Sequence, residues 1–80
     1  MNKNVDIFFA FLDYYETNVN SSNDMRICKT ILDNADCLES IDIKTLASMS
    51  NTSTASVSRF VKRFPVKNYK EFIHSFLVDF

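Results

Sequence analysis

Apolar residues recur at spacings of three and four in five stretches of this chain, a pattern typical of amphipathic helices. The first stretch, residues 5–15, is apolar on almost every side, and a polar break over residues 18–23 follows it. The second stretch ends near Asn34, and a third, shorter one covers residues 43–49. The fourth and fifth lie on either side of Pro65. The pattern therefore predicts an all-α domain of about five short helices.

Polar residues at the helix boundaries predict where four of these helices begin. A side-chain oxygen just before a helix can accept hydrogen bonds from the free N–H groups of the first turn. The expected N-cap residues are Ser21, Ser22 or Asn23 for the second helix, Asp42 for the third, Ser53 for the fourth and Asn68 for the fifth. Glu71, three residues after Asn68, completes a pattern resembling a capping box, and the fourth helix should end before Pro65.

One apolar stripe from each helix is expected to build the core. The assigned residues are Val5, Phe8, Phe9, Leu12 and Tyr15 in the first helix; Met25, Cys28, Ile31, Leu32 and Ala35 in the second; Ile43, Leu46, Ala47 and Met49 in the third; Val57, Phe60, Val61 and Phe64 in the fourth; and Tyr69, Phe72, Ile73, Phe76, Leu77 and Phe80 in the fifth. The first helix also carries Ile7, Phe11 and Tyr14 off its stripe. Because a surface helix needs only one apolar face, this surplus suggests burial against a second subunit. The alternative is that this helix is the centre of a small core.

Composition narrows the class of protein. The 80 residues contain no Gly and one Pro, and 46% of them are hydrophobic. These values exclude collagen-like, linker-like and disordered chains, and they disfavour the tight β-hairpin turns that need Gly. A chain of this size buries about two-thirds of the surface that it exposes when unfolded. We therefore expect a single domain over residues 1–80, with little room for a deep substrate cavity.

The charge of the chain is divided between its two halves. Residues 1–42 carry a net charge of −5 and residues 43–80 a net charge of +4, within an overall charge of −1. This asymmetry suggests a basic functional end and an acidic back. Ordinary solvated helix faces would explain the same charges equally well.

Residues 43–64 have the pattern of a helix-turn-helix, in which a short helix, a turn of about four residues and a second helix follow one another. Ala47 is small enough to let the two helices cross closely. Asn51 is the best candidate for a left-handed turn residue, because the chain has no Gly. Val57 and Phe60 would fix the second helix to the core.

The other side of this second helix is small, hydroxylated and basic. At about 100° per residue, Ala55, Arg59 and Lys62 face away from the apolar stripe, and Ser58 and Arg63 flank them. The major groove of DNA admits such a helix, where Arg59 can make a bidentate contact to guanine, while Lys62 and Arg63 can neutralise phosphates. A helix with a solvated basic face is the alternative interpretation.

Several segments of the chain form an ordered set. They are Ile31-Leu-Asp-Asn34, then Ile43-Lys-Thr-Leu-Ala47, then Thr52-Ser-Thr-Ala-Ser-Val-Ser-Arg-Phe60, then Lys62-Arg-Phe64, and finally Tyr69-Lys-Glu-Phe72. Together, over about residues 22–77, they resemble the N-terminal domain of RpiR-type transcription regulators. The chain departs from that family at Asn51, Pro65 and Asn68, which stand where the family has Gly, and at Thr52, where it has Val.

The resemblance implies a homeodomain-like helix-turn-helix domain that binds double-stranded DNA as a homodimer, which we expect to form through the N-terminal helix. The residues that it places at or near DNA are Ser53, Thr54, Ala55, Ser56, Ser58, Arg59, Lys62 and Arg63. In that family a sugar-isomerase-like domain follows, binds phosphosugars and controls genes of sugar metabolism. Since this chain stops at Phe80 inside an apolar stripe, we expect that effector domain, and any phosphosugar response, to lie outside it.

Other functions find less support in the sequence. Cys28, Cys37 and His74 cannot supply four zinc ligands within one chain, and a Gly-rich phosphate loop is excluded. No base and orienting acid accompany the serines in a recognisable order, so we expect no enzyme activity, cofactor or metal. The apolar run over residues 7–12 is too short to span a membrane, and we expect reduced thiols and a cytoplasmic protein. A helical protein-interaction or dimerisation module without DNA binding is the main alternative.

Overall fold

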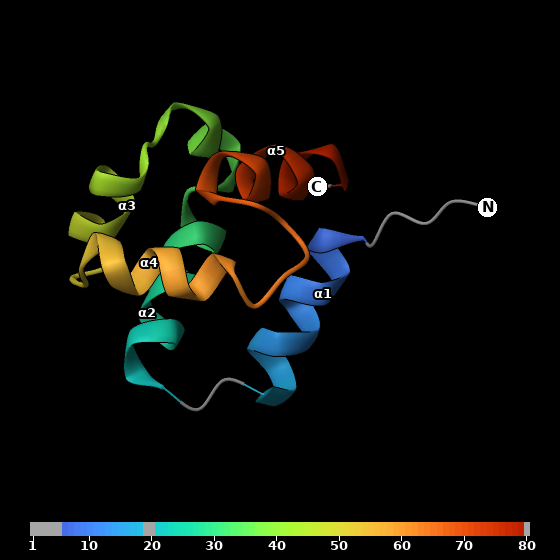
Figure 1. Cartoon of the computed structure of the whole chain (residues 1–80), viewed down its shortest axis with the longest axis horizontal. Helices are drawn as coiled ribbons and strands as arrows, with labels where there is room; N and C mark the ends of the chain where they lie inside the picture. The colour runs from blue at the N-terminus through green and yellow to red at the C-terminus, as the bar shows by residue number, and fades with distance from the viewer. Residues whose placement is uncertain (1–5, 19–20, 80) are drawn as a thin grey trace.

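The computed structural model describes residues 6–18 and 21–79, and every regular element in this part of the chain is helical. Its α-helices are α1 (Ile7–Asp13), α2 (Ser22–Asp33), α3 (Ile43–Met49), α4 (Thr54–Val61) and α5 (Tyr69–Asp79). A π-helical turn, η1 (Tyr14–Asn18), extends α1, and a 3-10 helix, η2 (Ala35–Ser40), follows α2. Helices α3 and α4 lie at one end of the molecule and α1 at the other (Figure 1). The predicted all-α class is confirmed, and η2 is an element that the sequence pattern did not predict.

Side-chain caps begin the helices where the sequence predicts them. The N-cap oxygens accept from first-turn N–H groups in four pairs: Ser21 and Asp24 (3.3 Å), Asp42 and Thr45 (2.8 Å), Ser53 and Ser56 (3.1 Å), and Asn68 and Glu71 (2.9 Å). Glu71 departs from a capping box, because its carboxylate accepts from the N–H of Lys67 at 2.6 Å and not from that of Asn68. Helix α1 begins at Ile7 with Asp6 as its N-cap, and its predicted first residue, Val5, lies outside the described residues.

Helix α1 turns a different face to the core from the predicted stripe. Ile7 and Phe11 are buried, whereas Phe9, which the stripe includes, is 67% exposed. The ring of Phe11 packs against those of Phe72 and Phe76 on α5, with centroids 6.4 and 5.2 Å apart. Because nearly every residue of α1 is apolar, its own sequence does not distinguish one face from another. Packing against α5 decides which face is buried.

The predicted stripes of α4 and α5 meet at a pair of buried aromatic residues. Phe60 and Phe72 are fully buried, and their rings lie 6.0 Å apart in an edge-to-face arrangement. Phe64 completes the contact, with its ring centroid 5.5 Å from that of Phe60. Aromatic pairs of this kind add about 0.5–1.5 kcal/mol each to the free energy gained from area burial. One side of α4 is thereby fixed to the core, and its other side faces outward. Phe80, the last residue of the predicted α5 stripe, lies outside the described residues.

Helices α2 and α3 each differ from their predicted stripes at one end. In α2, Ile27 is fully buried beside Cys28, whereas Met25, which the stripe includes, is only half-buried. In α3, Ala47 is buried at the crossing with α4, but Met49 is largely exposed at the helix end. The apolar spacing in the sequence therefore predicts which side of these short helices is buried, but it assigns the residues at the helix ends less well.

Candidate nucleic-acid interface

The turn between α3 and α4 contains the left-handed residue that the sequence predicts. Asn51 has a φ of 58°, and no other non-glycine residue with positive φ occurs in the described part of the chain. Asn is among the residues that enter this region most readily. The N–H of Thr52 donates to the carbonyl of Ala47 at 2.8 Å, which closes the turn over the end of α3. The hydroxyl of Ser50 donates to the carbonyl of Leu46 at 2.8 Å, and the same carbonyl also accepts from the N–H of Ser50 at 2.9 Å.

The outward side of α4 presents most of the residues predicted to lie near DNA. Thr54, Ala55, Arg59 and Lys62 are exposed, and Ser58 is partly exposed. Neither Arg59 nor Lys62 forms an ion pair within the described residues. The hydroxyl of Ser53 is exposed but engaged, since it accepts from the N–H of Ser56 as the N-cap of α4. This surface, made of Thr54, Ala55, Ser58, Arg59 and Lys62, is called the α4 face below.

Ser56 does not belong to the α4 face, although the sequence analysis places it near DNA. Its side chain is buried, with 8% of its surface exposed. Its hydroxyl oxygen accepts from the hydroxyl of Ser53 at 3.1 Å and lies 3.5 Å from the guanidinium of Arg59 and from the amide nitrogen of Asn23. Its contact with Asn23 shows that the side chain of Ser56 faces α2.

Arg63, which the sequence analysis also places at DNA, has two contacts within the fold. Its Nε lies 2.9 Å from a carboxylate oxygen of Asp24, and its guanidinium carbon lies 5.0 Å above the ring of Tyr14. The prediction assumed that the helix continues to Arg63. Helix α4 ends at Val61, so the direction of the Arg63 side chain is set by the turn that follows the helix. Its charge is directed toward the start of α2.

Asp24 is a structural residue that the sequence analysis missed. It is buried, and its carboxylate accepts hydrogen bonds from the Tyr14 hydroxyl and from Arg63. Burial, followed by this contact with Asp24, raises the pKa of Tyr14 to about 12. Asp24 lies three residues after the N-cap Ser21, a position where acidic residues are common in helices. Nothing in the neighbouring sequence indicates that it pairs with Arg63, which is 39 residues away.

Arg26 is a second residue that the sequence analysis missed. Its Nε donates to the carbonyl of Ser50 at 3.1 Å, and its Nη2 lies 3.4 Å from the carbonyl of Asn51. The same Nη2 donates to the side-chain oxygen of Asn23 at 2.6 Å. One guanidinium from α2 thus holds both carbonyls of the helix-turn-helix turn.

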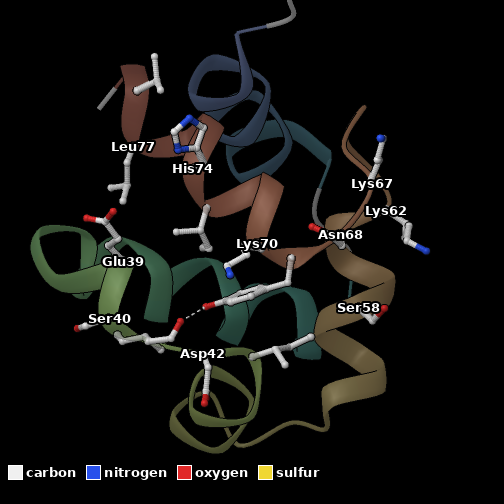
Figure 2. Close-up of a pocket in the computed structure, with 15 residues that line it drawn as sticks. Glu39, Ser40, Asp42, Ser58, Lys62, Lys67, Asn68, Lys70, His74 and Leu77 are labelled. Atoms are coloured by element: carbon white, nitrogen blue, oxygen red, sulfur yellow. Dashed lines mark hydrogen bonds between the residues drawn. The ribbon is translucent and has the colours of Figure 1, made fainter.

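A groove of about 900 Å³ lies beside the α4 face, between α5 and the segment that joins η2 to α3 (Figure 2). Lys62 and Lys67 lie at one end of it, and Glu39 lies near Leu77 at the other. The hydroxyl of Tyr69 donates across it to the carbonyl of Ile41 at 2.8 Å, and burial raises the pKa of Tyr69 to about 12. The rim of the groove carries both acidic and basic side chains, such as Glu39 and Lys67. The groove is therefore a poorer site for an anion than the α4 face, whose charged residues are all basic.

The structure offers little for metal or nucleophilic chemistry. Within residues 6–18 and 21–79, no group of three or more His, Cys, Asp or Glu side chains could hold a metal ion. Burial raises the pKa of the Cys28 thiol to about 12, which makes it a poor nucleophile. Cys37 and His74 are exposed on different elements. None of the described helices is both long enough and apolar enough to cross a membrane.

Comparisons of the chain with known families, proteins and structures found no match. The similarity to RpiR-type regulators therefore stays a prediction that rests on the motifs quoted above.

Proposed function

We propose that this domain binds duplex DNA by placing the α4 face in the major groove. The observation that carries the proposal is that the second helix of a helix-turn-helix buries its apolar side and presents Arg59 and Lys62 on the other. Neither of these two cations forms an ion pair with any of the residues that the structure describes. Thr54 and Ala55, at the start of the helix, are small and allow close approach to base edges. The buried aromatic contacts behind α4 hold this surface rigidly, which lowers the entropy lost on binding.

The exposed side chains have distinct roles in this proposal. Arg59 lies in the middle of the α4 face and makes a bidentate contact to guanine, the commonest specific contact of an arginine in the major groove. Lys62 lies about one turn further on and neutralises a phosphate. Ser58 donates to a phosphate or a base edge. Arg63 takes no part, because Asp24 and Tyr14 already hold its guanidinium.

The experiment that tests the proposal is selection of binding sites from random duplexes with the intact chain, followed by titration of the selected site at several salt concentrations. A recovered consensus, bound with an affinity that falls steeply as salt rises, is the expected result. Failure to enrich any sequence, together with no salt-dependent binding of random duplexes at micromolar protein, would refute DNA binding.

The resemblance to RpiR-type regulators suggests the biological process in which such DNA binding would take part. A domain that reads DNA would then be the N-terminal part of a regulator of sugar metabolism genes, with a phosphosugar as the effector of a following domain. The ordered motifs support this assignment, and the α4 face is consistent with it.

Self-association is a second candidate function, favoured by the aromatic ring on the outer side of α1. Phe9 is 67% exposed there, and Val78 on α5 is 69% exposed. Several apolar side chains of α1 are buried in the core of their own chain or packed against it. The apolar surface of α1 that a second copy could contact is therefore the surface around Phe9. Sedimentation at micromolar concentration should show a dimer that Phe9→Ser weakens, whereas a monomeric wild-type chain would exclude it.

A further inference from the structure

The turn between α3 and α4 contains backbone carbonyls that need hydrogen-bond donors from outside the turn. It joins α3 to α4 without a Gly, through the left-handed Asn51, and the carbonyls of Ser50 and Asn51 lie beyond the last hydrogen bonds of α3. Carbonyls at the end of a helix need donors from elsewhere. Arg26 provides them from α2, at 3.1 Å to Ser50 and 3.4 Å to Asn51. A lysine has one ammonium group where arginine has a planar fork, so it could not reproduce this set of contacts.

The same contacts continue into α4. The side chain of Asn23 accepts from Arg26 at 2.6 Å, and its amide nitrogen lies 3.5 Å from the hydroxyl of Ser56. That hydroxyl also lies 3.5 Å from the guanidinium of Arg59. The two longer contacts are weak individually, but they join the turn to the side chain that we assign to base reading.

The first turns of α2 therefore hold α4 at both ends. Arg26 and Asn23 hold the turn before α4 and its first residues, while Asp24 holds Arg63 just after the helix at 2.9 Å. The two anchors come from positions only a few residues apart on one helix, so they fix the direction of α4 relative to α2.

We propose that Arg26 is a positioning residue of the DNA-binding site: it sets the turn and the guanidinium of Arg59 without contacting DNA itself. The inference rests on the proposed function of the α4 face. Its alternative is that Arg26, which is partly exposed next to the turn, is one more phosphate contact. The two roles differ in what they do to salt dependence and to sequence preference.

The test compares Arg26→Lys, which keeps the charge and loses the forked contacts, with Lys29→Gln, an exposed position on the same helix. Affinity for the selected site and for random duplex is measured at several salt concentrations. Arg26→Lys should lower affinity for the selected site about tenfold, the effect of losing one charge-assisted hydrogen bond, and leave random binding unchanged. Lys29→Gln should change neither.

A double-mutant cycle with Arg59→Ala sharpens the test. If Arg26 acts through Arg59, most of the tenfold loss should disappear in the Arg59→Ala background, since the two side chains belong to one network. A loss caused only by lower stability would persist there. Helicity and thermal unfolding are recorded for each variant, and binding is compared well below the lowest melting temperature.

Two results would overturn the inference while leaving the proposed function intact. One is an unchanged ratio of specific to random binding in folded Arg26→Lys. The other is a loss for both duplexes in Arg26→Gln with a salt slope lower by about one unit, which would identify a phosphate contact. If Arg26 variants do not fold, Asn23→Ala provides the test, because it removes the side chain that joins Arg26 (2.6 Å) to the hydroxyl of Ser56 (3.5 Å). It should still lower the ratio of specific to random binding about threefold, the effect of losing a weak hydrogen bond. An unchanged ratio there would likewise refute the inference, whereas a wild-type chain that binds no duplex refutes the proposed function.

Discussion

Arg59, in the last turn of α4, and Arg63, four residues further along and just after the helix, differ in what they contact. Arg59 is exposed and forms no ion pair within the described residues. Arg63 holds the carboxylate of Asp24 at 2.9 Å and covers the ring of Tyr14. The comparison teaches that the number of cations near a helix overstates the charge available to a partner. Only the tertiary contacts separate a cation that can meet DNA from one that holds the fold together.

The largest expected effect comes from removing the partner of Arg63. Asp24→Ala deletes a buried carboxylate that accepts two side-chain hydrogen bonds, so the free energy of unfolding should fall by about 2–3 kcal/mol. Urea unfolding measures the change, and Asp33→Ala, exposed at the end of the same helix, is the matched control. A loss no larger than that of the control would show that this end of α4 is not anchored.

Arg59→Ala tests the exposed arginine of the pair. Because Arg59 is exposed, we expect a change in unfolding free energy below about 0.5 kcal/mol. Binding to the selected site should weaken by about 1–3 kcal/mol, and one base position should become tolerant of substitution. Titration of wild-type and singly substituted duplexes provides the measurement. An unchanged ratio of specific to random binding, with the fold intact, would show that Arg59 does not read sequence.

Lys62→Gln and Arg63→Gln remove the same charge at adjacent positions and should have opposite consequences. Lys62→Gln should weaken specific and random duplexes alike and lower the salt slope by about one unit, with no loss of stability. Arg63→Gln should leave the slope unchanged and cost about 1 kcal/mol of unfolding free energy, a modest value because the side chain is 48% exposed. Equal slopes for the two variants would contradict the contrast between these cations.

A smaller effect should follow from alkaline pH. The pKa of Tyr14 is raised by burial and by Asp24 from 10.0 to about 12, so its contribution to stability is complete below pH 10 and is lost as pH rises toward 12. Tyr69, also raised to about 12, adds to the same loss. Tyr14→Phe should therefore reduce the fall in stability over this range without abolishing it. Absorbance titration of the phenols checks this, and ionisation of Tyr14 near pH 10 in the folded protein would count against it.

Local features of the sequence were enough to predict the five α-helices and the turn between α3 and α4, although not η2. Ser53 and Asp42 act on N–H groups three residues away, and Asn51 is left-handed because of its own backbone preference and the absence of Gly. The buried side of α4 follows from Val57 and Phe60 at helical spacing, since their neighbours on the other side are polar. Such features depend on residues within one turn of each other, where the spacing along the chain determines the geometry.

The tertiary structure alone decided which face of α1 is buried, and it alone brought Arg26 and Arg63 to their partners. An apolar helix such as α1 carries no contrast between its sides, so the rings of α5 selected Phe11 for the core and left Phe9 outside. Arg26 and Arg63 meet partners 24 and 39 residues away. The sequence by itself determined the five α-helices and the outward face of α4. The assignment of its charges to structure or to binding depended on long-range contacts, because a charged side chain on a helix has the same local signature whether its partner is water, a buried carboxylate or the carbonyls of a distant turn.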